Sequence, residues 1–272
     1  MSNNEEVGLY RQTPNSNFTM RPSIDLIAVI VFIYAILTMT SCNHNNQKDS
    51  HKRETKLLSY GTLVQAKNYR SLKEALVQKD SVYKLILYQD DIEELDNRII
   101  QLHHLNVLEL TRNNLSDLPD GINKLQSLQA LYLSHNNFDE IPDVLFGLKN
   151  LKRLDISFNP LNQIPHDISK INTLEELQLS STGIKKIPKG VFSIENMKVL
   201  TANKNQISKI SPMIKKAENL EVLELSHNKI KDLPEEIKHC KKLKRVDLEG
   251  NPLSDKLIRE LITWLPNTKF NY

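Results

Sequence analysis

The residues best suited to covalent or acid–base chemistry are few and scattered. The chain has two cysteines, Cys42 and Cys240. Cys240 falls on an otherwise apolar position of the repeat described below, which favours a buried thiol over a nucleophile. His103 and His104 are adjacent in the sequence, so they do not share one face of a strand or helix. The sequence therefore predicts no enzyme activity, no catalytic residue, no metal site and no cofactor.

The overall composition excludes several classes of partner and fold. The formal net charge is only +3, which is too balanced for a field that gathers nucleic acid. Only 7 glycines leave little room for glycine-rich phosphate loops. One tryptophan and 6% aromatic residues argue against a surface that stacks bases. Two cysteines cannot build a disulfide framework. We therefore expect no nucleic-acid partner.

The chain repeats itself every 23 residues without an insertion or deletion. The units start at Val82, Leu105, Leu128, Leu151, Leu174, Met197, Leu220 and Leu243. Within a unit, apolar positions 4 and 6 alternate with exposed ones and predict a short strand. Position 15 is usually Pro, which excludes an interior strand there, and apolar positions 18 and 21 fit one helical turn. One unit cannot bury its apolar face alone, so stacked units with a continuous core are expected.

Position 9 of the unit explains the many asparagines. A column of asparagine directly after the strand can bond backbone groups of its own turn and of adjacent turns. The unit at 174 has Thr182 here, so the column should be weakest at that point. The predicted structural ladder comprises Asn113, Asn136, Asn159, Asn205, Asn228 and Asn251.

This pattern resembles the leucine-rich repeat family. The motif LxxLxLxxNxLxxLPxxIxxLxx is that of the 23-residue class with the LP signature, and it covers about residues 82–253. The resemblance implies an α/β solenoid, curved like a horseshoe, with a parallel sheet on the concave side. It also implies short 3₁₀ or helical segments on the convex side. The family is an interaction scaffold, although a fold alone does not name the partner.

Both ends of such a solenoid need caps. Upstream, we expect an N-terminal cap over residues 57–81, with a helix in 69–80 and a capping box formed by Ser71 and Glu74. Downstream, residues 254–272 should form a C-terminal cap. Its helix would carry an apolar stripe and end before Pro266, and the last residues are expected to add an extended segment. The stripe comprises Leu257, Ile258, Leu261, Ile262 and Leu265.

Binding residues are expected at positions 3, 5, 7 and 8, which should project from the concave sheet. Exposed aromatic residues and arginines are the usual anchors of protein interfaces. The alternative is that these are ordinary solvated strand positions. The candidate binding residues are Tyr88, Glu109, Arg112, Tyr132, Arg153, Asp155, Phe158, Glu224, Arg245 and Asp247.

The N-terminal residues 1–41 are expected to be a signal or membrane segment. Its uncharged apolar run, residues 26–37, is short for a spanning helix, which needs about 20 residues, but suits the core of a signal peptide. Ser41 and Cys42 end a stretch that resembles a relaxed bacterial lipobox, in which the cysteine is lipidated. Residues 42–56 then form a polar tether. Translation that starts at Met20 would give a signal peptide of more usual form.

An uncleaved anchor is the alternative. Lys48, Lys52, Arg53 and Lys56 follow the apolar run and outnumber Arg11 and Arg21 before it, which would place the repeats in the cytoplasm. We favour a membrane-anchored recognition protein of the cell envelope, periplasmic or at the surface, that binds a protein partner. The alternatives are an envelope-attachment spacer or glycan binder, and a cytoplasmic scaffold behind a transmembrane anchor.

Overall fold

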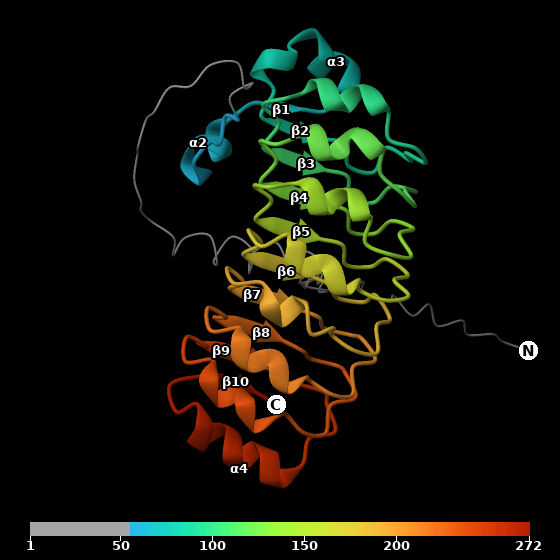
Figure 1. The fold of residues 1–272 in the computed structure, drawn as a ribbon. Helices are drawn as coiled ribbons and strands as arrows, with labels where there is room; N and C mark the ends of the chain where they lie inside the picture. The colour runs from blue at the N-terminus through green and yellow to red at the C-terminus, as the bar shows by residue number, and fades with distance from the viewer. Residues whose placement is uncertain (1–54) are drawn as a thin grey trace, which may run out of the picture. The chain divides into compact units, whose positions relative to one another are not determined.

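The computed structural model describes residues 55–272. The apolar run 26–37, Met20, Cys42 and all but the end of the predicted tether lie outside these residues. The described chain forms one parallel sheet in which ten strands follow each other in sequence order (Figure 1). The strands are β1 (Asn68–Tyr69), β2 (Lys84–Ile86), β3 (Val107–Glu109), β4 (Ala130–Tyr132), β5 (Arg153–Asp155), β6 (Glu176–Gln178), β7 (Val199–Thr201), β8 (Val222–Glu224), β9 (Arg245–Asp247) and β10 (Lys269–Asn271).

The sheet confirms the solenoid expected from the repeat. Strands β2 to β9 occupy positions 3–5 of their units, and neighbours pair residues that hold the same position. Leu108, for example, pairs with Leu131, and Leu131 with Leu154. Each repeat position therefore becomes a row that crosses the sheet from unit to unit.

The opposite side of each unit is built from short 3₁₀ turns. They are η2 (Asn97–Gln101), η3 (Asp120–Lys124), η4 (Asp143–Gly147), η5 (His166–Lys170), η6 (Val191–Ser193), η7 (Pro212–Lys216) and η8 (Glu235–His239). In four units the proline at position 15 directly precedes the turn, as at Pro142, where φ is −60°. The fixed φ of proline suits the entry to such a turn and explains the LP signature.

A single core runs through the stack between the sheet and the 3₁₀ turns. The unit at 128 shows the rule, because Leu131, Leu133, Phe138 and Leu145 are fully buried. Every unit adds the same apolar positions to this core. The interior is therefore as long as the stack and belongs to no single unit.

The N-terminal cap differs from the single helix expected over 69–80. It contains α2 (Tyr60–Gln65), strand β1, α3 (Leu72–Val77) and the turn η1 (Lys79–Ser81). The predicted capping box is wrong, because the Ser71 side chain makes no capping bond. The carboxylate of Glu74 instead binds the ammonium of Lys67 at 2.8 Å.

The C-terminal cap is α4 (Asp255–Trp264) followed by β10. The Ser254 hydroxyl caps the helix by accepting the Leu257 N–H at 3.2 Å. Leu257 and Leu261 are buried, but Ile262 is 56% exposed, so the expected apolar stripe is narrower than predicted. Within residues 55–272, no helix has the length and apolar character needed to cross a membrane.

Candidate functional site

Position 5 places half of the candidate binding residues in one row. Glu109 pairs with Tyr132, and Tyr132 with Asp155, at the ends of β3, β4 and β5. Glu224 pairs with Asp247 at the ends of β8 and β9. Gln178 and Thr201 separate these two groups. The structure thus places these five candidates in two separate groups along the position-5 row.

Position 3 supplies two of the three candidate arginines, Arg153 and Arg245, and both have acidic partners. Arg153 Nε lies 3.3 Å from a carboxylate oxygen of Glu176 on the next strand. Arg245 binds Glu224 on the preceding strand. The ring of Tyr60, the first residue of α2, lies 5.9 Å from the guanidinium carbon of Arg153. The N-terminal cap therefore reaches the concave side of β5.

The central carboxylates lie in surroundings that disfavour their charge. Burial raises the pKa of Glu109, Asp155 and Glu176 above the usual carboxyl values. Hydrogen bonds oppose this effect, since Asp155 accepts the Ser157 N–H at 2.9 Å. Burial also raises the pKa of the Tyr132 hydroxyl. Ionisation of this cluster therefore costs free energy in the folded protein.

Position 8 lies just after the strand and has an unusual backbone. All seven non-glycine residues there have positive φ, including Arg112 (59°), His135 (55°) and Phe158 (55°). This region is costly for residues other than glycine. The rings of His135 and Phe158 stack with centroids 4.1 Å apart and planes inclined by 7°. Phe158 is 36% exposed, and Arg112 is also exposed, so this row presents an aromatic and cationic surface.

Position 7 has a structural role that the sequence reasoning missed. The Ser180 N–H donates to the Ser157 hydroxyl at 3.1 Å, and the Asn203 N–H donates to the Ser180 hydroxyl at 3.2 Å. The Ser226 N–H likewise donates to the Asn203 side chain at 2.8 Å. The recurrence of small polar residues was the available signal. Tyr88 breaks this rule at position 7 and is 45% exposed.

The asparagines at position 9 bond backbone groups of two units. Asn159 Oδ1 accepts the Phe138 N–H at 3.0 Å, and its Nδ2 donates to the carbonyls of Leu133 and Ile156 at 2.9 and 3.0 Å. The same pattern holds for Asn113, Asn136, Asn228 and Asn251. Asn205 donates to the same two carbonyl positions, but its Oδ1 accepts the N–H groups of Thr182 and Gly183.

The asparagine ladder is interrupted at Thr182. Its hydroxyl donates to the Leu179 carbonyl at 2.9 Å. The Leu161 N–H, whose counterparts bond the next asparagine, donates to the Asn159 carbonyl at 2.8 Å. Gly183 follows with φ of +80°, a conformation that glycine adopts readily. The unit at 174 therefore uses a different turn.

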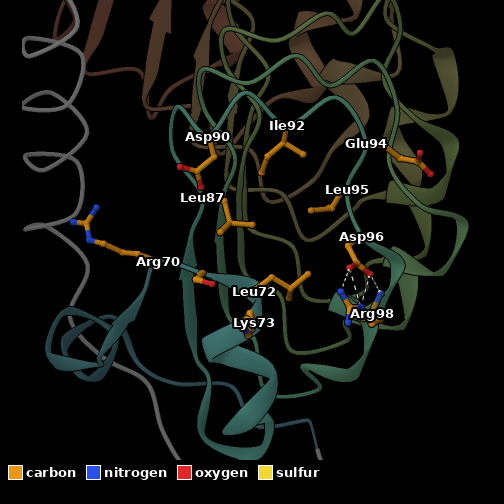
Figure 2. Close-up of a pocket in the computed structure, with 11 residues that line it drawn as sticks. Arg70, Leu72, Lys73, Leu87, Asp90, Ile92, Glu94, Leu95, Asp96 and Arg98 are labelled. Carbon is orange, nitrogen blue, oxygen red and sulfur yellow. Dashed lines mark hydrogen bonds and ion pairs between the residues drawn. The ribbon is translucent and has the colours of Figure 1, made fainter.

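A shallow depression of about 380 Å³ lies at the N-terminal end of the repeats (Figure 2). Leu87, Ile92 and Leu95 supply its apolar wall, and Arg70 and Asp90 lie beside it. Figure 2 shows the Arg98 guanidinium directed at the Asp96 carboxylate, with the closest atoms 2.5 Å apart. No pattern in the sequence predicted this depression, because its residues come from two separate segments.

Cys240, the one cysteine among residues 55–272, does not have the surroundings of a reactive thiol. Cys240 is fully buried, its thiol donates to the Ile214 carbonyl at 3.2 Å, and burial raises its pKa to about 11. Such a thiol is protonated at neutral pH and a poor nucleophile. Across residues 55–272, no three His, Cys, Asp or Glu side chains lie close enough to hold a metal ion.

Several solved structures resemble this chain. A structure titled as the TLR13–ssRNA13 complex is 30% identical, with a TM-score of 0.61, over 68% of this chain and 27% of that chain. The ectodomain of GASSHO1/SCHENGEN3 from Arabidopsis thaliana, in complex with CASPARIAN STRIP INTEGRITY FACTOR 2, is 28% identical, with a TM-score of 0.50, over 59% of this chain and 20% of that one. This chain thus spans far less than two thirds of either receptor.

Internalin C2 from Listeria monocytogenes shares the fold at 22% identity, with a TM-score of 0.62, over 72% of this chain and 83% of that chain. A comparison with curated proteins returned no match. Among protein families, the model described as "Leucine rich repeat" matches residues 80–138 and 126–184, and "Leucine Rich repeats (2 copies)" matches 218–262. Because these matches cover more than half of the sequence, the chain belongs to the leucine-rich repeat family.

Proposed function

We propose that this protein is a non-catalytic, membrane-anchored recognition protein that binds a protein partner through the concave face of its repeats. Leucine-rich repeats are typical scaffolds for protein–protein recognition. The observation that carries the proposal is the stacked pair His135 and Phe158 in the position-8 row, next to the exposed Arg112. Aromatic and arginine side chains anchor protein interfaces.

The charge of the position-5 row favours a protein over a nucleic acid. TLR13 was solved with ssRNA13, so a leucine-rich repeat surface can bind RNA. Here that row carries four acidic residues and no Lys or Arg, so it offers no cation to a phosphate group. GASSHO1/SCHENGEN3 was solved with CASPARIAN STRIP INTEGRITY FACTOR 2, and another similar structure is titled PEPR1-AtPEP1. The acids in question are Glu109, Asp155, Glu224 and Asp247.

The proposed location is the cell envelope, through a lipid on Cys42. The support is the short apolar run 26–37 and the polar tether that follows Cys42. The alternative to this lipid anchor is a single membrane-spanning segment with the repeats in the cytoplasm. Envelope attachment as a spacer and glycan binding are the competing functions for the repeats themselves.

Photo-crosslinking in cells tests the concave site. A photoreactive residue is placed at Phe158 in one variant and at Lys186, an exposed lysine outside the sheet, in a matched control. We expect a protein adduct from position 158 that is absent from position 186 and is weakened by Arg112→Ala. Equal amounts of adduct at both positions, or no adduct at either, would favour a role of the repeats as a spacer. An adduct removed by glycosidase treatment would point to a glycan ligand.

A further inference from the structure

Residues 56–58, just before α2, run past the N-terminal ends of strands β3 and β4. The Leu58 N–H donates to Asn106 Oδ1 at 2.9 Å, and Asn106 Nδ2 donates to the Lys56 carbonyl at 2.9 Å. Gln129 Nε2 donates to the Leu58 carbonyl at 2.9 Å. The Lys56 N–H donates to the Ser127 hydroxyl at 3.2 Å. Every one of these bonds involves the main chain of the segment, so they hold an extended backbone regardless of its side chains.

The repeat departs from its own pattern where this segment binds. Asn106 and Gln129 hold position 2 of their units, and the five later units carry alternating Lys and Glu there. Those later residues form an ion-pair ladder, with Lys198 2.7 Å from Glu175 and Lys244 2.6 Å from Glu221. The two carboxamides instead bond the main chain of the segment. Asn106 is fully buried and Gln129 is 8% exposed.

The contacts of residues 56–65, which we call the strap, are polar and few. Helix α2 buries no residue, and Leu57, Tyr60 and Val64 are 44%, 43% and 51% exposed. Figure 1 shows α2 beside the stacked strands and outside the core. Water can replace the hydrogen bonds of such a segment, so it can open while the core stays folded.

We propose that Asn106 and Gln129 form a docking site for an extended polypeptide, which Lys56–Leu58 occupies in cis and which a partner's segment takes over when the strap opens. The inference rests on the proposed function, because it assumes that the partner is a protein. The partner segment presents alternate main-chain groups to the carboxamides. Its first residue is basic, since Lys56 Nζ lies 2.7 Å from the Tyr83 hydroxyl and 5.1 Å from its ring centroid.

Opening of the strap also affects the concave site. Tyr60 is the link, because its ring lies over the Arg153 side chain on β5. A partner that displaces Lys56–Leu58 therefore also removes Tyr60 from a candidate binding residue. Partner binding beside the N-terminal ends of β3 and β4 is therefore coupled to the exposure of Arg153 on the concave face.

The test uses the full chain and a labelled synthetic peptide with the sequence of residues 55–66. Leu58→Pro removes the N–H that Asn106 accepts and leaves the docking site intact. Leu57→Pro is the matched control, because the Leu57 N–H is not among the bonds that hold the strap. We expect the peptide to bind Leu58→Pro at least tenfold more tightly than wild type, because the competing cis segment no longer occupies the site. Adding Gln129→Ala should abolish the gain.

Two outcomes would overturn the proposal. One is equal peptide affinity for wild type, Leu57→Pro and Leu58→Pro. The other comes from hydrogen exchange of the wild type, if the Leu58 amide exchanges as slowly as amides of β4 and so opens only on global unfolding. Exchange at least tenfold faster than in β4 supports a releasable strap. Because these measurements need no natural partner, they can fail independently of the crosslinking at Phe158.

Discussion

Asn159 shows how one side chain can hold two units together. It bonds backbone groups of its own unit and of the preceding one, and it is 2% exposed. Asn159→Ala leaves those buried groups unpaired, so we expect a loss of about 1–3 kcal/mol in the free energy of unfolding. Urea denaturation measures it. The exposed Asn162→Ala is the control, and equal losses for both variants would contradict the role of the ladder.

The sign of the Asp155 effect follows from its raised pKa. The folded protein binds this proton more tightly than the unfolded chain, so the ionised carboxylate lowers stability at neutral pH. That cost is present above the folded pKa and vanishes below the unfolded pKa. Asp155→Asn should therefore raise the melting temperature at pH 7, and the gain should shrink as the pH falls.

Asp167 serves as a control because its pKa is shifted in the opposite direction. The ammonium of Lys170 lies 2.6 Å away and lowers the pKa of this exposed carboxyl. Asp167→Asn should therefore give no gain at pH 7. If Asp155→Asn lowers the melting temperature at pH 7, its hydrogen bond to the Ser157 N–H outweighs the cost of burying its charge.

At the scale of elements, Leu154 tests the register of the strands. It lies on β5, is 1% exposed, and pairs with Leu131 and Leu177 on the neighbouring strands. Leu154→Ala removes core volume shared by three units, and we expect a cost of about 2–5 kcal/mol in urea denaturation. Lys152→Ala, exposed in the same unit, should cost far less. A loss below about 1 kcal/mol for Leu154→Ala would contradict this register.

The repeated elements were predictable from the sequence, whereas the N-terminal cap was only partly so. Alternation at positions 4 and 6 located β2 to β9, because each short strand recurs in every unit and the repetition reinforces a weak local signal. Strand β1 spans two residues, Asn68 and Tyr69, and has no such repetition. The strap depends on bonds to Asn106 and Gln129, about 50 and 70 residues away in the sequence, and local patterns do not encode such bonds.

The same distinction applies to the candidate site. The row that holds Glu109, Tyr132 and Asp155 follows from the period of 23 once the strands are parallel and in register. The partners of Arg153 and Arg245 depend on side-chain conformations in the folded sheet. The stacking of Phe158 on His135 depends on a positive φ that residue type alone does not reveal.

At the scale of the whole molecule, the proposed anchoring through Cys42 would decide which partners the repeats can meet. If Cys42 is lipidated, the membrane-extracted protein should have the mass of residues 42–272 plus lipid. Its acyl chains would hold it to the membrane, at about 0.8 kcal/mol for each buried CH₂ group. Cys42→Ser should abolish fatty-acid labelling and processing. Full-length, unlabelled protein that still carries residues 26–37 would instead indicate a spanning anchor and cytoplasmic repeats.

The bonds at Lys56–Leu58 also determine how the molecule responds to mechanical load. A pulling force on the chain before residue 55 reaches the Asn106 and Gln129 side chains first, and passes from them into the units at 105 and 128. Strand β1, a two-residue edge of the sheet, and α3 carry no tension until those bonds shear. Hydrogen bonds of Lys56 and Leu58 would therefore protect β1 and α3 from a force applied to the preceding part of the chain.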